Sequence, residues 1–179
     1  MVTDYTLHGK NVVHMTRESD ELHFFYDAQN RPAVVAYNGV PYAYVKSLQG
    51  DVIAILDADG NVVVSYAYDA WGMPIGKSGT LAETLGTLNP FRYRGYVFDE
   101  ETGLYYLRSR YYNPQCGRFV NADVLMNQNM YVYCLNSPTT SADKDGFECE
   151  YCHENHEPMQ GNWGDNLLEI SANGLNKSW

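Results

Sequence analysis

Short runs of aromatic and β-branched residues, separated by turn-forming residues about every 8 to 12 positions, dominate the chain between Leu22 and Ile75. Tyr, Val and Ile are the residue types that half-buried strands favour, and no helical period intervenes. Asn38-Gly39 is a strong hairpin signal, because both central positions of a type I′ turn need a positive φ. We therefore expect a meander of antiparallel hairpins, with strands at LHFFY, AVVAY, VPYAYVK, VIAIL and VVVSYAY.

The β pattern is interrupted between residues 77 and 89 and then resumes. Thr80 to Leu88 is predicted to form one short helix, with Thr80 as its N-cap and Glu83 as the capping-box partner. Polar, glycine-terminated turns at DEETG and NPQCG are typical of hairpins. The predicted fold is mainly β, and its later strands are Phe91 to Phe98, Leu104 to Tyr112 and Arg118 to Val120.

Charge and hydropathy exclude two classes of partner. The 179 residues include 22 acidic and 12 basic ones, a net charge of −10, and such a chain repels a phosphate backbone, so we expect no nucleic-acid partner. No apolar run approaches the roughly 18 residues of a membrane span, and the first residues lack the pattern of a signal peptide.

Five bases cluster among tyrosines, and we interpret them as sheet-stabilising Arg–Tyr and Arg–Asp pairs: Arg92, Arg94, Arg108, Arg110 and Arg118.

Two longer stretches carry a family resemblance. NPFRYRGYVFDEETGLYYLRSRYYNPQCGRFVNAD (Asn89 to Asp123) and NMYVYCLNSPTTSADKDGF (Asn129 to Phe147) resemble the Rhs-repeat-associated core domain, and their GLYYLRSRYYNP and GRF elements are highly specific. Upstream, the pairs Tyr26-Asp27 and Tyr68-Asp69 resemble the YD repeats that precede that core. The chain is identified as a member of the Rhs family over roughly residues 22 to 147.

The resemblance implies a β-ribbon shell of YD repeats that ends in an Rhs core plug. Proteins of this kind are polymorphic toxins or wall-associated proteins that sequester a variable C-terminal effector. The implied partners are the remainder of a larger Rhs shell or its effector, and the implied location is secreted or at the cell surface. Because 179 residues are too few to wind a closed cage, we expect a terminal fragment or a remnant of a larger shell.

Charge also marks a boundary near Phe147. The last 32 residues carry six acids and one lysine, which is half of the net charge. We expect four parts: residues 1–21 as a partly β lead-in, 22–88 as YD-repeat-like hairpins, 89–147 as the Rhs-associated core domain, and 148–179 as an irregular acidic variable tail. About 30 residues are too few for a conventional enzyme domain, so no effector activity is expected in the tail.

In the resembled family the core is a self-cleaving aspartyl protease that cuts after a D-P-x-G-L motif. The resemblance assigns its functional residues to Arg110, Asp123 and Asp143, and the cut to the bond after Phe147. Two close carboxylates do not both ionise cheaply, so one keeps a proton as an acid while the other activates water, and an arginine holds the pair.

The sequence departs from the family pattern at two positions beside these aspartates. Val124 follows Asp123 where the family has proline, and Lys144 replaces the proline of D-P-x-G-L. Loss of that proline removes a fixed φ where the scissile segment is presented. The alternative interpretation is that the arginine and the aspartates form an ordinary ion-pair network that closes the plug.

The tail contains the sequence CEYCHENH, whose thiols and imidazoles are potential zinc ligands: Cys149, Cys152, His153 and His156. The adjacent Cys152 and His153 would have to diverge sharply to share one tetrahedral ion. C-x-x-C-H is also the haem c attachment pattern. Incidental ligands in an acidic tail are the interpretation we favour, and no cofactor is expected.

Three function classes remain after these exclusions. The first is a structural end-piece of an Rhs shell that encloses or displays a C-terminal segment. The second is an autoprotease that acts within its own chain and on no external substrate. The third is a cell-surface module that binds cell-wall glycans through its tyrosines, which fits the 16 tyrosines but has no specific motif behind it.

Overall fold

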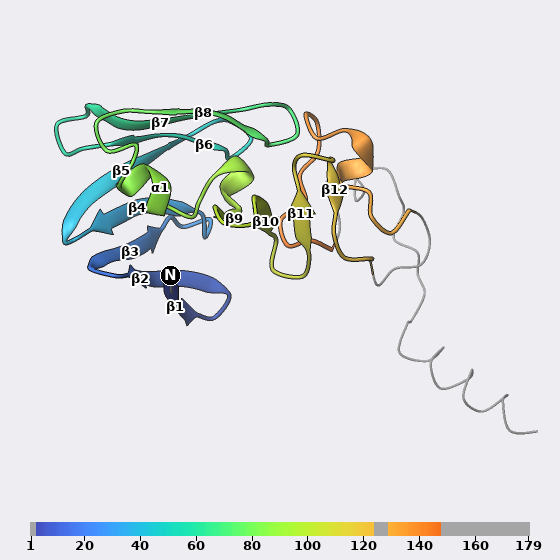
Figure 1. Cartoon of the computed structure of the whole chain (residues 1–179), viewed down its shortest axis with the longest axis horizontal. Coiled ribbons are helices and arrows are strands. Elements are labelled where there is room, and N and C mark those ends of the chain that lie inside the picture. Colours follow the sequence, from blue (N-terminus) through green and yellow to red (C-terminus); the bar gives the residue numbers. More distant parts are fainter. Residues whose placement is uncertain (1–2, 124–128, 148–179) are drawn as a thin grey trace, which may run out of the picture.

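The computed structural model describes residues 3–123 and 129–147, and these form two antiparallel sheets (Figure 1). In the larger sheet each strand pairs with the next along the chain: β1 (Thr3–His8), β2 (Asn11–Arg17), β3 (Asp20–Tyr26), β4 (Pro32–Tyr37), β5 (Val40–Lys46), β6 (Val52–Leu56), β7 (Val62–Tyr68) and β8 (Pro74–Ser78). The smaller sheet, in the order β12-β11-β10-β9, contains β9 (Val97–Asp99), β10 (Leu104–Tyr106), β11 (Tyr111–Asn113) and β12 (Arg118–Phe119). The predicted mainly β fold is confirmed.

Helical structure among the described residues is short. It consists of the four-residue helix α1 (Leu85–Leu88) and two 3₁₀ segments, Tyr93–Gly95 and Cys134–Asn136. None of the described helices has the length and apolar character needed to cross a membrane.

The five strands predicted between residues 22 and 68 correspond to β3 through β7. Three of them, β5, β6 and β7, have the predicted bounds. The two-residue turn between β4 and β5 is also confirmed, because Asn38 has a φ of 49° and Gly39 a φ of 81°. Local turn chemistry and strand propensity were therefore sufficient to locate these strands.

Alternation along the strands separates an inner from an outer face. Leu22 and Phe24 of β3 are buried, whereas His23 and Phe25 between and after them point to the outer face. Figure 1 shows the strands curling from β1 at the bottom to β8 at the top, with α1 between them. The inner face buries its apolar side chains against α1 and Phe91, whose ring meets that of Phe24 edge-on with centroids 5.0 Å apart. Each large side chain buried in this way contributes roughly 1.5–3 kcal/mol to stability.

The helix is shorter than predicted and begins at Leu85, five residues after Thr80. Thr80 is not its N-cap, since the capping position is Thr84 and makes no side-chain capping bond. The preceding segment is held by β7 instead: the N–H of Leu81 donates to Val63 O at 2.9 Å. Tertiary contact with the sheet thus replaces the first turn that the capping-box pattern predicted.

The predictions for the core strands were wrong in two places. Phe91 to Phe98 is not one strand, because the chain turns through Tyr93–Gly95, where Arg94 has a φ of 55°. Leu104 to Tyr112 is split into β10 and β11 by a turn in which Arg108 has a φ of 69°. Residues other than glycine rarely adopt such angles. The two arginines therefore gave no sequence signal for a turn at either position.

Tyrosines form the centre of the smaller sheet. Tyr105, Tyr112 and Tyr133 are fully buried, and the rings of the last two lie 4.1 Å apart. Tyr105 donates its hydroxyl proton to Gly72 O and Tyr112 donates to Trp71 O, both at 2.7 Å. The two sheets are therefore joined through the turn between β7 and β8. Buried hydroxyls of this kind need a partner, and the backbone of that turn supplies it.

A buried polar junction connects α1 to the meander. Arg92, 3% exposed, donates from Nη2 to Gly86 O at 2.6 Å and from Nη1 to the Tyr66 hydroxyl at 2.8 Å. Its guanidinium also lies over the Tyr66 ring, 4.2 Å from the centroid. Asn89 accepts the hydroxyl proton of Tyr44 at 2.6 Å. For Arg92 the predicted pairing of arginine with tyrosine is confirmed.

Candidate active site

Arg110 occupies the centre of the candidate site, immediately before β11. The turn from Leu107 to Arg110 is closed by a hydrogen bond from the N–H of Leu107 to Arg110 O at 3.0 Å. Only 6% of Arg110 is exposed, and its guanidinium carbon lies 3.7 Å from the centre of the Phe119 ring on β12. This packing fixes the plane of the guanidinium, so its N–H groups have defined directions.

Both predicted aspartates contact this guanidinium. Nη1 of Arg110 lies 2.8 Å from Oδ2 of Asp123, and Nη2 lies 3.4 Å from Oδ2 of Asp143. The two side chains come from segments 20 residues apart in sequence, and their carboxylates meet adjacent nitrogens of one arginine. The structure therefore brings together the three residues that the sequence analysis singled out.

Asp143 is the more deeply buried of the two aspartates, at 2% exposure. Burial raises the pKa of Asp143 to about 6, against the opposing effects of the Gly146 N–H and of Arg110. Its Oδ1 accepts the Gly146 N–H at 2.7 Å, and Tyr96 donates its hydroxyl proton to the backbone carbonyl of Asp143 at 2.5 Å. Asp143 therefore retains its proton to a higher pH than an ordinary aspartate.

The segment that precedes the predicted cut is held against the same turn. Gly146 O accepts a hydrogen bond from Arg110 Nε at 2.5 Å, and Asp145 O accepts one from the Ser109 hydroxyl at 2.7 Å. Gly146 has a φ of 78°, and a Cβ there would lie 2.5 Å from Ser109 Oγ and 2.9 Å from Leu107 O. This position requires glycine because its φ is positive and because an added Cβ would clash with Ser109 and Leu107. Phe147 follows with 49% exposure.

Chemically, the site combines a carboxyl group that keeps its proton to a higher pH than usual with a second carboxyl group in close ion-pair contact with arginine. Such a pair of unlike environments is what general acid–base chemistry requires. The same contacts also serve a structural role, since Asp143 closes the turn to Gly146 and Arg110 binds three segments of chain. Geometry alone is compatible with both roles.

The predicted zinc ligands Cys149, Cys152, His153 and His156 lie outside the described residues. The sequence analysis missed a different group of potential ligands within them, His14, Glu21 and His23. The signal was an H-x₆-E-x-H spacing across a hairpin, which has meaning only once the register of the two strands is known.

The tyrosines of the smaller sheet are partly buried and partly exposed. Tyr105, Tyr112 and the adjacent Tyr133 are buried, and their hydroxyls bond within the protein. Tyr106 and Tyr111 are exposed, with ring centroids 5.2 Å apart. One pair of exposed rings with no specific motif behind it does not carry the glycan-binding alternative, and we do not propose it.

Comparison with known proteins gives a family match over most of the chain. The model of the Teneurin YD-shell family matches residues 11–159. The chain belongs to the Teneurin YD-shell family. The resemblance to YD-repeat and Rhs proteins is thereby confirmed.

Three relatives of this YD-shell segment are much longer proteins. The tRNA3(Ser)-specific nuclease WapA of Bacillus spizizenii is 38% identical over 156 residues, which cover 81% of this chain and 7% of that protein. The tRNA nuclease WapA of Bacillus subtilis is 44% identical over 112 residues, 59% of this chain and 5% of that protein. Toxin protein Tse5 of Pseudomonas aeruginosa is 47% identical over 60 residues, 32% of this chain and 5% of that protein.

Solved YD-shell structures share the fold. The crystal structure of TcdB2-TccC3 superposes with a TM-score of 0.63 at 23% identity, over 79% of this chain and 7% of that chain. The Tc holotoxin pore of Photorhabdus luminescens gives a TM-score of 0.64 at 22% identity, over 80% and 7%. The chain is therefore a segment with a YD-shell fold, and it spans about 7% of the length of these proteins.

Proposed function

We propose that this chain is the C-terminal end-piece of a YD-repeat shell of the polymorphic-toxin or wall-associated type, and that it encloses or displays the segment after Phe147. In this proposal residues 22–88 form shell hairpins that follow the lead-in at 1–21, residues 89–147 form the plug, and 148–179 is the variable tail. It acts as part of a secreted or cell-surface protein, and its partners are the rest of the shell and the enclosed effector. The names of its relatives, tRNA nucleases and a toxin protein, support that setting.

The observation that carries this proposal is the continuous curled sheet β1–β8, whose inner face is covered in part by α1 and Phe91. The inner face packs on α1 and Phe91, and it leaves a hollow of about 1000 Å³ between the first strands and residues 87–111. A curled sheet with a hollow inner side is the geometry of a shell wall, and a segment packed against that side is the geometry of a plug.

Replacement of the matching segment of B. subtilis WapA by this chain's residues tests the proposal. We expect the chimera to be recovered soluble and as resistant to limited proteolysis as WapA itself. A matched chimera that carries Arg92→Ala should lose that resistance, because the change breaks the buried junction between plug and wall. A chimera degraded like its Arg92→Ala counterpart would contradict the end-piece role.

We further propose that the site at Arg110 cleaves the chain after Phe147. The contacts of Asp123 and Asp143 with one guanidinium support this, as does the binding of residues 145 and 146 to Arg110 and Ser109. In this mechanism the Arg110-paired Asp123 takes a proton from the attacking water, and Asp143 donates its proton toward the scissile amide. Water adds to the carbonyl carbon of Phe147, the bond from that carbon to the nitrogen of Glu148 breaks, and this nitrogen takes the electron pair and the proton from Asp143 and leaves as an amine.

Intact mass spectrometry of the full chain tests the cleavage. We expect a product that ends at Phe147 in the parent and only the intact mass in Asp123→Asn and Asp143→Asn. Asp59→Asn, on the exposed turn between β6 and β7, is the matched control and should cleave like the parent. An intact parent, folded by circular dichroism, would leave the three residues as plug architecture.

A further inference from the structure

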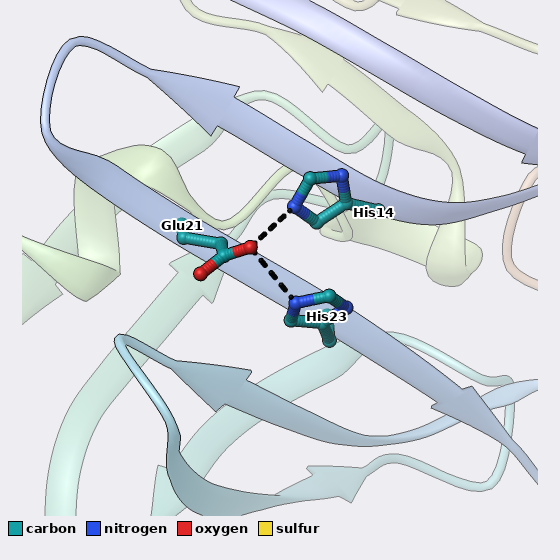
Figure 2. Close-up of side chains that lie close together, drawn as sticks. All are labelled: His14, Glu21 and His23. Atoms are coloured by element: carbon teal, nitrogen blue, oxygen red, sulfur yellow. Dashed lines mark hydrogen bonds and ion pairs between the residues drawn. The ribbon is translucent and has the colours of Figure 1, made fainter.

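Three potential metal ligands lie together on the outer face of the hairpin formed by β2 and β3 (Figure 2). The register pairs His14 directly with His23 across the two strands, and Glu21 lies two residues before His23 on the same face. Met15 and Leu22, which alternate with them, are buried on the inner face. The hairpin register therefore creates the cluster, remote from the Arg110 site in the fold.

Two of the three distances in this cluster are close to the separation of ligand atoms on one metal ion. Oε1 of Glu21 lies 3.0 Å from Nε2 of His14 and 3.1 Å from Nε2 of His23, and all three ligand atoms lie within 4.8 Å of one another. A tetrahedral ion with bonds of roughly 2.0–2.1 Å holds its ligand atoms about 3.3 Å apart. Figure 2 shows both imidazoles directed at the same carboxylate oxygen.

The surroundings favour a cation at this place. The imidazole rings stack with centroids 4.4 Å apart, which holds both nitrogens on one side. The strand neighbours on the outer face are small and uncharged, namely Thr6 opposite His14, Ala36 opposite His23 and Thr16 opposite Glu21.

We propose that His14, Glu21 and His23 form a binding site for a divalent metal ion of the zinc class on the outer face of the shell wall. Two imidazole nitrogens and one carboxylate are ligands that zinc accepts, and they leave the fourth tetrahedral position for water. The ion joins β2 to β3 and so stabilises the first hairpins of the meander. Because only neutral imidazole binds a metal, affinity falls in acid.

Site-resolved NMR of the full chain tests the proposal, with zinc sulfate as the probe. Titration should shift the imidazole resonances of His14 and His23, and leave those of His8 on exposed β1 unchanged. Loss of an outer-shell partner alone costs roughly 10- to 100-fold in affinity. The variants His14→Gln, His23→Gln and Glu21→Gln should each weaken the binding measured at these resonances by at least about tenfold, whereas His8→Gln should not.

Two further readouts keep the test decisive. Far-UV circular dichroism checks that each variant folds, and zinc should raise the thermal unfolding midpoint of the parent and of His8→Gln but not of His14→Gln/His23→Gln. The tail holds its own potential ligands, so the resonances of His153 and His156 are followed in parallel. Zinc that shifts only those resonances, or that binds the His14→Gln/His23→Gln protein as tightly as the parent, would overturn the proposal.

Discussion

At the scale of single residues, the most unusual group is Asp143, a buried carboxyl group with its pKa raised to about 6. An unfolded aspartate has a pKa of about 3.9. The folded state therefore binds more protons than the unfolded state between those two values. Its contribution to stability is fully present below about pH 4 and is lost as the pH rises through about 6.

This difference predicts how stability depends on pH. The free energy of unfolding of the parent should fall, relative to that of Asp143→Asn, by up to about 3 kcal/mol between pH 4 and pH 7. Urea unfolding of both proteins at each pH measures the difference, and the neutral side chain of the variant supplies the control. Curves that run parallel from pH 4 to pH 7 would show that Asp143 ionises normally.

Gly146 gives a second prediction at this scale. Gly146→Ala should destabilise the fold by about 1–2 kcal/mol from its positive φ, and further because the new Cβ meets Ser109 and Leu107. Gly103→Ala is the matched control, since its φ is 70° but nothing lies within 4 Å of the added Cβ. Urea unfolding should rank the two variants in that order, and equal losses would refute the close packing at Gly146.

At the scale of elements, the polar junction at Arg92 connects α1 to β7. Removal of Arg92 leaves the carbonyl of Gly86 and the hydroxyl of Tyr66 with their mutual hydrogen bond of 2.9 Å but without the charged donor, and each lost bond to the guanidinium costs about 1.5–3 kcal/mol. We expect Arg92→Ala to lower the free energy of unfolding by at least about 2 kcal/mol. Arg118→Ala, an exposed arginine of β12, should change it by less than about 0.5 kcal/mol. Similar values for the two variants in urea would contradict the junction.

The elements also show how far sequence reasoning reaches. Strands β5 to β7 were predicted because their propensity and turns are local properties. Strand β8 was missed: PIGKS begins with proline and contains glycine, and only its pairing with β7 at the sheet edge makes it a strand. The turns at Arg94 and Arg108 were missed because both residues are arginines, a type that rarely adopts a positive φ and does not mark a turn.

The candidate sites divide in the same way. Arg110, Asp123 and Asp143 were found through their motifs, which mark residues wherever they lie in the fold. His14, Glu21 and His23 were not found, because they belong to no motif and meet only through the cross-strand register. A one-residue change of that register would separate them onto opposite faces.

At the scale of the whole molecule, the described chain is a segment of a YD-repeat shell. Eight antiparallel strands make one curled sheet with α1 and Phe91 packed on its inner side, and the smaller sheet lies beside it and binds the turn between β7 and β8 (Figure 1). Strands β1 and β8 are the two edges of this sheet, where further hairpins of a longer shell would continue the ladder.

An electron cryomicroscopy map of the WapA chimera is the most direct test of the central claim, that this chain forms the closing end of a YD shell. The account predicts density in which β1 continues the ribbon of WapA, the residues up to Phe147 plug its end, and the segment after Phe147 lies inside the shell or at its opening. A map in which this chain folds apart from the ribbon, with the shell open beside it, would contradict the claim.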